Sequence, residues 1–193
     1  MSPDRWAVAA ESDRVQWDCE PLVRVGPLWF GMALRDATVA MDAHGFSSDT
    51  SPIADFGPFG QVRVQFRRTD RASAGQVDVV AYFVDSIGLA CVTVDARTGP
   101  QVTLDGIRLI GRRPSELASE IAGHLQDTGR TLQFTPEGEI SSQEWGMLPR
   151  AQRAGDVLLT RAVFGTPNSW AHTMDDCIPA DEWETHPVIG SGR

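Results

Sequence analysis

Residues 61–67 read Gln-Val-Arg-Val-Gln-Phe-Arg, and their apolar and polar side chains alternate without a break. In an extended chain this alternation gathers the apolar members on one face, namely Val62, Val64 and Phe66. Two more apolar runs, at 77–84 and 89–94, follow after short polar turns. Runs of this length joined by short turns predict an antiparallel meander with one buried face and one face in water.

The stretch 114–127 predicts a helix. Its large apolar residues recur every fourth position, at Leu117, Ile121 and Leu125. Pro114 suits the first helical position, and Glu116 suits the positive end of the helix dipole. Together with the meander, this helix predicts an α+β fold in which an antiparallel sheet carries one or two helices on one face.

A similar unit occurs twice, at 26–41 and 106–121. Each unit has two glycines five residues apart, an apolar run between them and an acid five residues after the second glycine. An amphipathic helical stretch follows in both. The repeat has two interpretations, an internal duplication of a strand–helix unit or the chance recurrence of ordinary strand–turn–helix sequence.

The length of 193 residues suffices for one substantial domain or for two small halves with a shared core. We expect a single α+β domain over 1–165, which a duplication would divide into halves at 20–100 and 101–165. Residues 166–193 carry few periodic signals and are predicted to form an irregular C-terminal extension. Gly, Pro, Ser and Asp cluster at 45–60, which predicts a long loop.

Charge and hydropathy narrow the class of partner. The net charge is −9, which argues against nucleic acid because phosphate binding draws on clustered positive charge. No stretch approaches the ~20 apolar residues of a membrane span, and the apolar run near the N-terminus is too short for a signal peptide. We therefore expect an acidic cytoplasmic protein that binds neither nucleic acid nor membranes.

Catalytic and metal-binding patterns find little support in the sequence. The segment 172–186 is rich in His, Asp and Glu and includes Cys177, but its spacing matches no zinc pattern. The three cysteines form no C-x-x-C pair, and no G-x-S-x-G motif occurs. We predict no catalytic residue, no metal ligand and no cofactor, and we favour a protein that is not an enzyme.

Candidate binding residues are of three kinds. Tryptophan and arginine are favoured at protein interfaces, and carboxylates attract a cationic partner. Arginines along one strand can hold an anionic group. The residues predicted on these grounds are Trp170, Trp183, Asp175, Asp176, Arg63 and Arg67. The competing interpretation is structural: each tryptophan packs in the core, and the arginines form a solvated strand face.

The segments 94–106, 111–117 and 26–32 resemble a group of small uncharacterised proteins of streptomycetes and their relatives. That resemblance implies no activity and no functional residues. Separately, Phe-Gly-Met at 30–32 before a short helix resembles the repeated helix-plus-sheet unit of secreted inhibitor and lipoprotein-assembly domains. This second resemblance bears on the fold alone.

The leading hypothesis is a non-enzymatic protein-binding module, such as an inhibitor or an immunity-type partner. The alternative is a small-molecule-binding domain or an enzyme, with a site near the 45–60 loop or at His172, Asp175 and Asp176. The partner is predicted to be another protein or a second copy of this chain.

Overall fold

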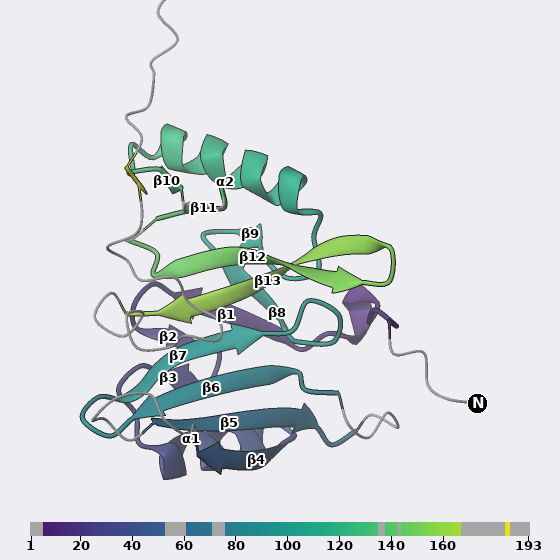
Figure 1. The fold of residues 1–193 in the computed structure, drawn as a ribbon, viewed down its shortest axis with the longest axis vertical. Coiled ribbons are helices and arrows are strands. Elements are labelled where there is room, and N and C mark those ends of the chain that lie inside the picture. The colour runs from purple at the N-terminus through teal and green to yellow at the C-terminus, as the bar shows by residue number, and fades with distance from the viewer. Residues whose placement is uncertain are drawn as a thin grey trace, which may run out of the picture.

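A six-stranded sheet forms one layer of the computed structural model, which describes residues 6–52, 61–70, 76–134, 138–142, 144–166 and 184–185. Figure 1 shows this sheet, whose strand order is β12-β13-β7-β6-β5-β4. Its strands are β4 (Phe46–Pro52), β5 (Gln61–Arg68), β6 (Val79–Val84), β7 (Gly88–Val94), β12 (Met147–Ala154) and β13 (Val157–Gly165).

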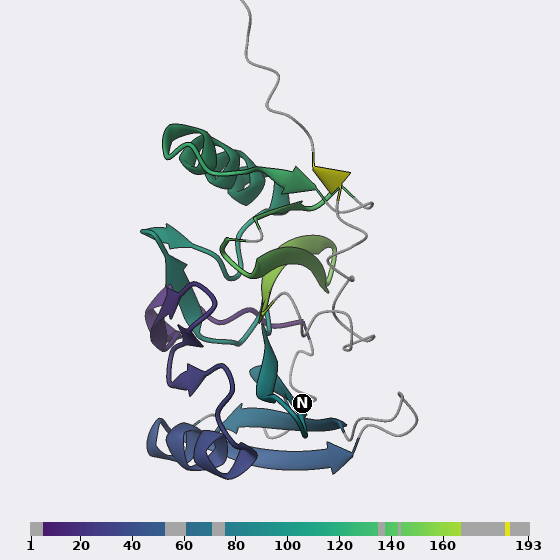
Figure 2. The same cartoon turned by 90° about the vertical axis from the view of Figure 1, so that its left-hand side faces the viewer.

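The second layer contains two helices and a five-stranded sheet, all on the same side of the large sheet (Figure 2). The helices are α1 (Leu34–Ala43) and α2 (Pro114–Asp127), and a 3-10 turn spans Glu11–Asp13. The five-stranded sheet, in the order β3-β2-β1-β8-β9, contains β1 (Gln16–Glu20), β2 (Arg24–Val25), β3 (Leu28–Trp29), β8 (Gln101–Leu104) and β9 (Ile107–Arg108). A small third sheet contains β10 (Gln133–Phe134), β11 (Ile140–Ser141) and β14 (Glu184–Thr185).

The predicted meander and the predicted helix are both confirmed. β5, β6 and β7 pair antiparallel in sequence order. Val64 and Phe66 are fully buried, and Val62 packs against the same core. The α2 residues Leu117, Ile121 and Leu125 are buried in that core too. The α+β architecture with helices on one face of the sheet therefore follows from the alternation of polarity seen in the sequence. Neither described helix is long and apolar enough to cross a bilayer.

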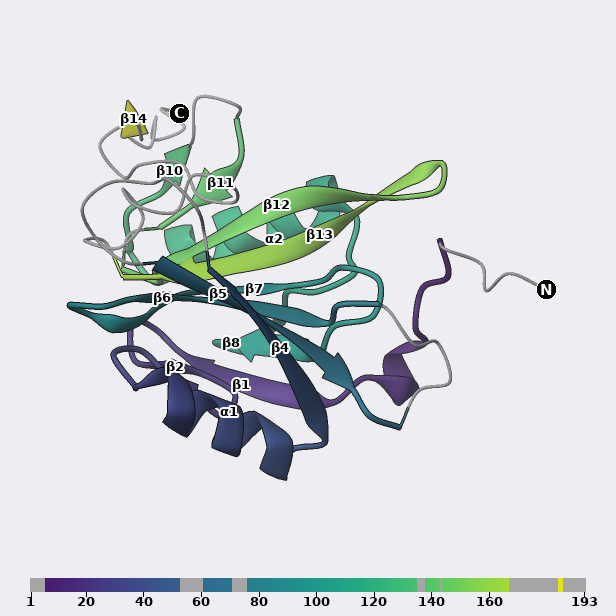
Figure 3. The ribbon, with the colours of Figure 1, turned by 60° about the horizontal axis from the view of Figure 1, so that its bottom comes forward.

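The loop predicted at 45–60 is wrong for its first half, because 46–52 form β4. This strand lies at the end of the sheet (Figure 3), and its pairing partner among the described residues is β5. Its side chains from Ser47 to Thr50 are exposed, so the strand needs no apolar residues there. An edge strand of this kind shows no alternation of polarity in its sequence. The second half of the predicted loop, residues 53–60, lies outside the described part of the chain.

The two repeated units make the same hydrogen bonds. In each unit the N–H of the second glycine donates to a strand carbonyl. The N–H of that strand residue donates back to the carbonyl after the glycine. The four bonds are Gly31 N–H to Leu89 O (2.8 Å), Leu89 N–H to Met32 O (2.9 Å), Gly111 N–H to Thr160 O (2.9 Å) and Thr160 N–H to Arg112 O (2.8 Å). We call each set a backbone clamp.

The clamps also relate the two long strands β7 and β13. The clamped strand residues are Leu89 in β7 and Thr160 in β13. When these two residues are aligned, Val92 corresponds to Val163 and Thr93 corresponds to Phe164. These four residues pair in crossed order, Val92 with Phe164 and Thr93 with Val163. Crossed pairing is what a two-fold axis between β7 and β13 produces. The two units thus clamp strands that are related by an approximate two-fold axis, an arrangement that an internal duplication predicts.

The first glycines of the repeat are not equivalent in space. Gly26 takes the first position of the β2–β3 turn, with φ of +53°, and Pro27 follows it. Gly106 takes the second position of the β8–β9 turn, with φ of +84°, after Asp105 with φ of +49°. The two hairpins therefore have different turn types, II′ and I′, both of which suit the twist of the flanking strands.

Candidate functional site

An exposed tryptophan stands out on the outer face of the five-stranded sheet. Val25 and Leu28 point into the core, so the alternation of strand side chains turns Arg24 and Trp29 outward. These two residues pair across β2 and β3, and the Arg24 guanidinium lies 5.7 Å from the centre of the indole ring. Trp29 nevertheless remains 52% exposed. On the other side of Arg24, Glu20 Oε2 lies 3.5 Å from its Nε.

The turn before β2 adds two apolar side chains to this region. The Val23 N–H donates to Glu20 O at 3.0 Å, which closes a turn with Pro21 and Leu22 at its centre. Leu22 has φ of +61°, a conformation that this type of turn normally gives to glycine. Leu22 and Val23 are each 37% exposed. The left-handed conformation of Leu22 costs about 1–2 kcal/mol. Local backbone strain of this kind is often found at functional sites.

We call this surface the Trp29 corner; its residues are Glu20, Leu22, Val23, Arg24 and Trp29. It combines an exposed indole, two exposed aliphatic side chains and one ion pair on short, well-paired strands. No pattern in the sequence predicted this surface, although Trp29 lies within the repeated unit. The available signal was a tryptophan between Leu28 and Phe30, which faces away from the core if both neighbours face inward.

The predicted arginine pair lies on β5, on the face opposite Val64. Arg67 donates from Nη2 to Gln65 Oε1 at 2.7 Å, and its Nη1 lies 3.8 Å from Asp49 Oδ2. Arg63 is partly buried, and its Nε has no hydrogen-bond partner. The structure thus places both arginines on one strand face, but Arg67 is already engaged within the sheet.

The predicted C-terminal residues cannot be placed. Trp170, Trp183, Asp175 and Asp176 all lie outside the described residues, and so does His172. Trp145, by contrast, is 1% exposed and belongs to the core, in line with the structural interpretation of the tryptophans.

One grouping of cysteine, histidine and aspartate tests the enzymatic alternative. His124 Nε2 lies 3.4 Å from Asp105 Oδ2, and Arg130 Nη1 lies 2.6 Å from the same oxygen. Burial raises the pKa of the nearby Cys19 thiol to about 12, against an opposing effect of Arg24. A thiol with such a pKa stays protonated at neutral pH and is a poor nucleophile. The His124 ring packs 5.6 Å from the ring of the buried Trp145, whereas Asp105 is exposed at the surface.

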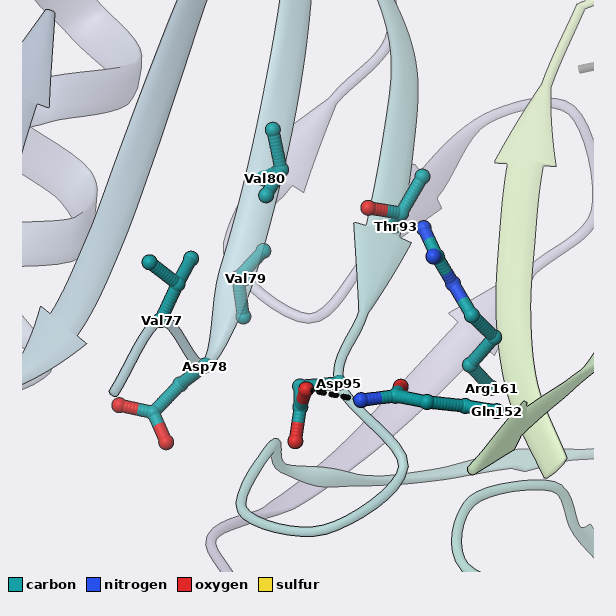
Figure 4. Close-up of a pocket in the computed structure, with 8 residues that line it drawn as sticks. All are labelled: Val77, Asp78, Val79, Val80, Thr93, Asp95, Gln152 and Arg161. Carbon is teal, nitrogen blue, oxygen red and sulfur yellow. Dashed lines mark hydrogen bonds between the residues drawn. The ribbon is translucent and has the colours of Figure 1, made fainter. Parts of the chain in front are cut away.

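The cavity in Figure 4 has a volume of about 100 Å³ and contains two carboxylates. Asp78 is 2% exposed, and its Oδ2 accepts the Arg68 N–H at 2.7 Å. Asp95 Oδ1 accepts the N–H groups of Arg97 and Thr98, and its Oδ2 accepts Gln152 Nε2. The space holds about three waters, well below the size of a typical ligand pocket. Asp78 thus bonds the end of β5, and Asp95 bonds the turn that follows β7 and the β12 side chain of Gln152.

The described residues contain no group of three or more His, Cys, Asp or Glu side chains that could hold a metal ion. No family model, curated protein or solved structure matches the chain.

Proposed function

We propose that this chain is a non-enzymatic protein-binding module and that the Trp29 corner contacts its partner. The observation that carries this proposal is the 52% exposure of Trp29 beside the guanidinium of Arg24. Tryptophan and arginine contribute much of the binding free energy at protein interfaces. Burial of an exposed indole against a partner removes apolar surface from water and so stabilises the complex.

The geometry suits a rigid contact. Trp29 and Arg24 lie on paired strands, and the Glu20 carboxylate holds Arg24 in place, so little side-chain entropy is lost on binding. The partner surface would offer an apolar pocket for the indole and an acceptor for the outer N–H groups of Arg24. An inhibitor or an immunity-type protein uses a preformed surface in this way.

Observations on other groups also favour binding over catalysis. The Cys19 thiol is protonated at neutral pH, and the carboxylates of Asp78 and Asp95 accept hydrogen bonds from neighbouring backbone N–H groups. The alternative site near 45–60 loses its loop character over 46–52, which are strand β4.

The test is a comparative affinity purification from native lysate at physiological salt, with quantitative mass spectrometry of the bound proteins. The variants are Trp29→Ala and, as a control of similar exposure, Leu158→Ala at the start of β13 (55% exposed). We expect one protein to be retained by the wild type and by Leu158→Ala and lost with Trp29→Ala. A central anchor of this kind weakens binding about 30-fold when truncated. Identical recovery by all three proteins would contradict the proposal.

A further inference from the structure

The outer edge of β4 differs from the other sheet edges within the described residues. β4 pairs with β5 over seven consecutive residues, from Phe46 opposite Arg68 to Pro52 opposite Val62, without a register shift. β3 and β9, at the edges of the smaller sheet, have two residues each. β12, at the far end of the large sheet, contains Pro149 and two arginines.

The pairing with β5 fixes which backbone groups point outward. The Thr69 N–H donates to Gly45 O at 3.0 Å, so Gly45 and Thr69 form a hydrogen-bonded pair at the end of the same ladder. Bonding alternates along an antiparallel ladder, so Ser48 and Thr50 direct their N–H and C=O groups toward the open edge. Pro52 falls in the same outward set, where a missing N–H removes no bond to β5.

Proteins usually protect such an edge with lysines, bulges, prolines or very short strands. The central part of β4 has none of these features. Its side chains from Ser47 to Thr50 are exposed, and the one charged residue among them is Asp49. The Asp49 carboxylate lies 3.8 Å from Arg67 Nη1, which offsets part of its charge. The edge is therefore ready to pair with another strand.

We infer that β4 pairs antiparallel with β4 of a second copy of this chain, which joins two large sheets edge to edge. A two-fold axis at Ser48 satisfies the outward groups of both strands and places the uncharged Ser47 opposite the partner's Asp49, so that no like charges face each other. An axis at Asp49 would instead place two carboxylates opposite each other, which is destabilising. The edge is self-complementary in the first register, and this selects a second copy as the occupant.

Charge variants at position 47 test this register by sedimentation velocity over a range of concentrations. Ser47→Asp faces the partner's Asp49 and should weaken the dimer, whereas Ser47→Arg should strengthen it. Each change should shift the dimer Kd by about 2- to 30-fold, because two symmetry-related pairs are altered. Within one chain Ser47 lies opposite Arg67. Ser47→Asp should therefore stabilise the folded monomer, and Ser47→Arg should destabilise it, which is the reverse of their effects on the dimer. A loss of the dimer in Ser47→Asp is then not a result of unfolding.

Backbone variants at the centre of the edge test the hydrogen bonds directly. Ser48→Pro removes the outward N–H and should give a monomer, whereas Ser48→Ala retains it and should leave the dimer intact. Trp29→Ala should also leave the dimer intact, which separates this inference from the proposed function. A wild-type chain that stays monomeric at all concentrations would overturn the inference, as would a dimer that survives Ser48→Pro. Protection of the β4 amides only after a foreign protein is added would likewise overturn it and assign the edge to that protein.

Discussion

Two glycines with nearly equal φ angles offer a controlled test of the backbone clamp. Gly88 has φ of +82° and Gly106 has φ of +84°, so an alanine at either position incurs the same left-handed strain, about 1–2 kcal/mol. Their surroundings differ. A Cβ at Gly106 would meet nothing within 4 Å. A Cβ at Gly88 would lie 2.7 Å from Met32 O and 2.8 Å from the Gly31 carbonyl carbon.

The extra loss expected at Gly88 follows from these contacts. Both neighbours are backbone atoms of the clamp, which holds Leu89 with hydrogen bonds of 2.8 and 2.9 Å. Relief of the clash must break these two bonds, each of which contributes about 0.5–1.5 kcal/mol. Gly106→Ala should therefore reduce the free energy of unfolding by about 1–2 kcal/mol and Gly88→Ala by about 2–5 kcal/mol.

Urea unfolding followed by tryptophan fluorescence measures both variants. Constant m-values would show that the denatured state is unchanged. If the two variants lost the same stability, the close approach between β7 and the segment before α1 would be refuted, because the backbone angle alone would then explain both effects.

Two further predictions concern buried polar groups. Arg14 donates to the carbonyls of Gly99, Ala96 and Arg97 at 2.6, 2.8 and 3.0 Å, so Arg14→Met should reduce stability by about 3 kcal/mol or more; an unchanged urea midpoint would be inconsistent with this role. The Cys19 thiol ionises near pH 9.0 when unfolded and near 12 when folded, so the unfolded state loses its proton first and stability should fall as pH rises through this interval. Cys19→Ala should flatten that part of the stability profile, and an unaltered slope would argue against the raised pKa.

The sequence predicted the parts of the fold in which burial is periodic. The alternation at Val62, Val64 and Phe66 reflects a sheet with one buried face, and the spacing in α2 reflects a helix with one buried stripe. Both patterns are local consequences of burial, so one sequence suffices to detect them. β4 was not predicted because its exposed side chains show no alternation of polarity. β12 was not predicted because Pro149 interrupts its pattern.

The candidate site was harder to predict. β3 contains two residues, too few to show a period, so the outward direction of Trp29 depends on its pairing with Arg24. The raised pKa of Cys19 depends on burial beneath segments distant in the sequence. The repeat predicted two related units, and both units make the same backbone clamp. It nevertheless matched Gly26 with Gly106, which occupy different turn positions, because letter spacing does not record turn type.

Site-specific photo-crosslinking tests the role of the Trp29 corner most directly. A photoreactive phenylalanine analogue is placed at position 29 or, as a control, at position 158, and the cells are irradiated with the partner at its natural level. We expect a discrete adduct with one protein from position 29 and none from position 158. The same adducts from both positions, or none from position 29, would contradict it.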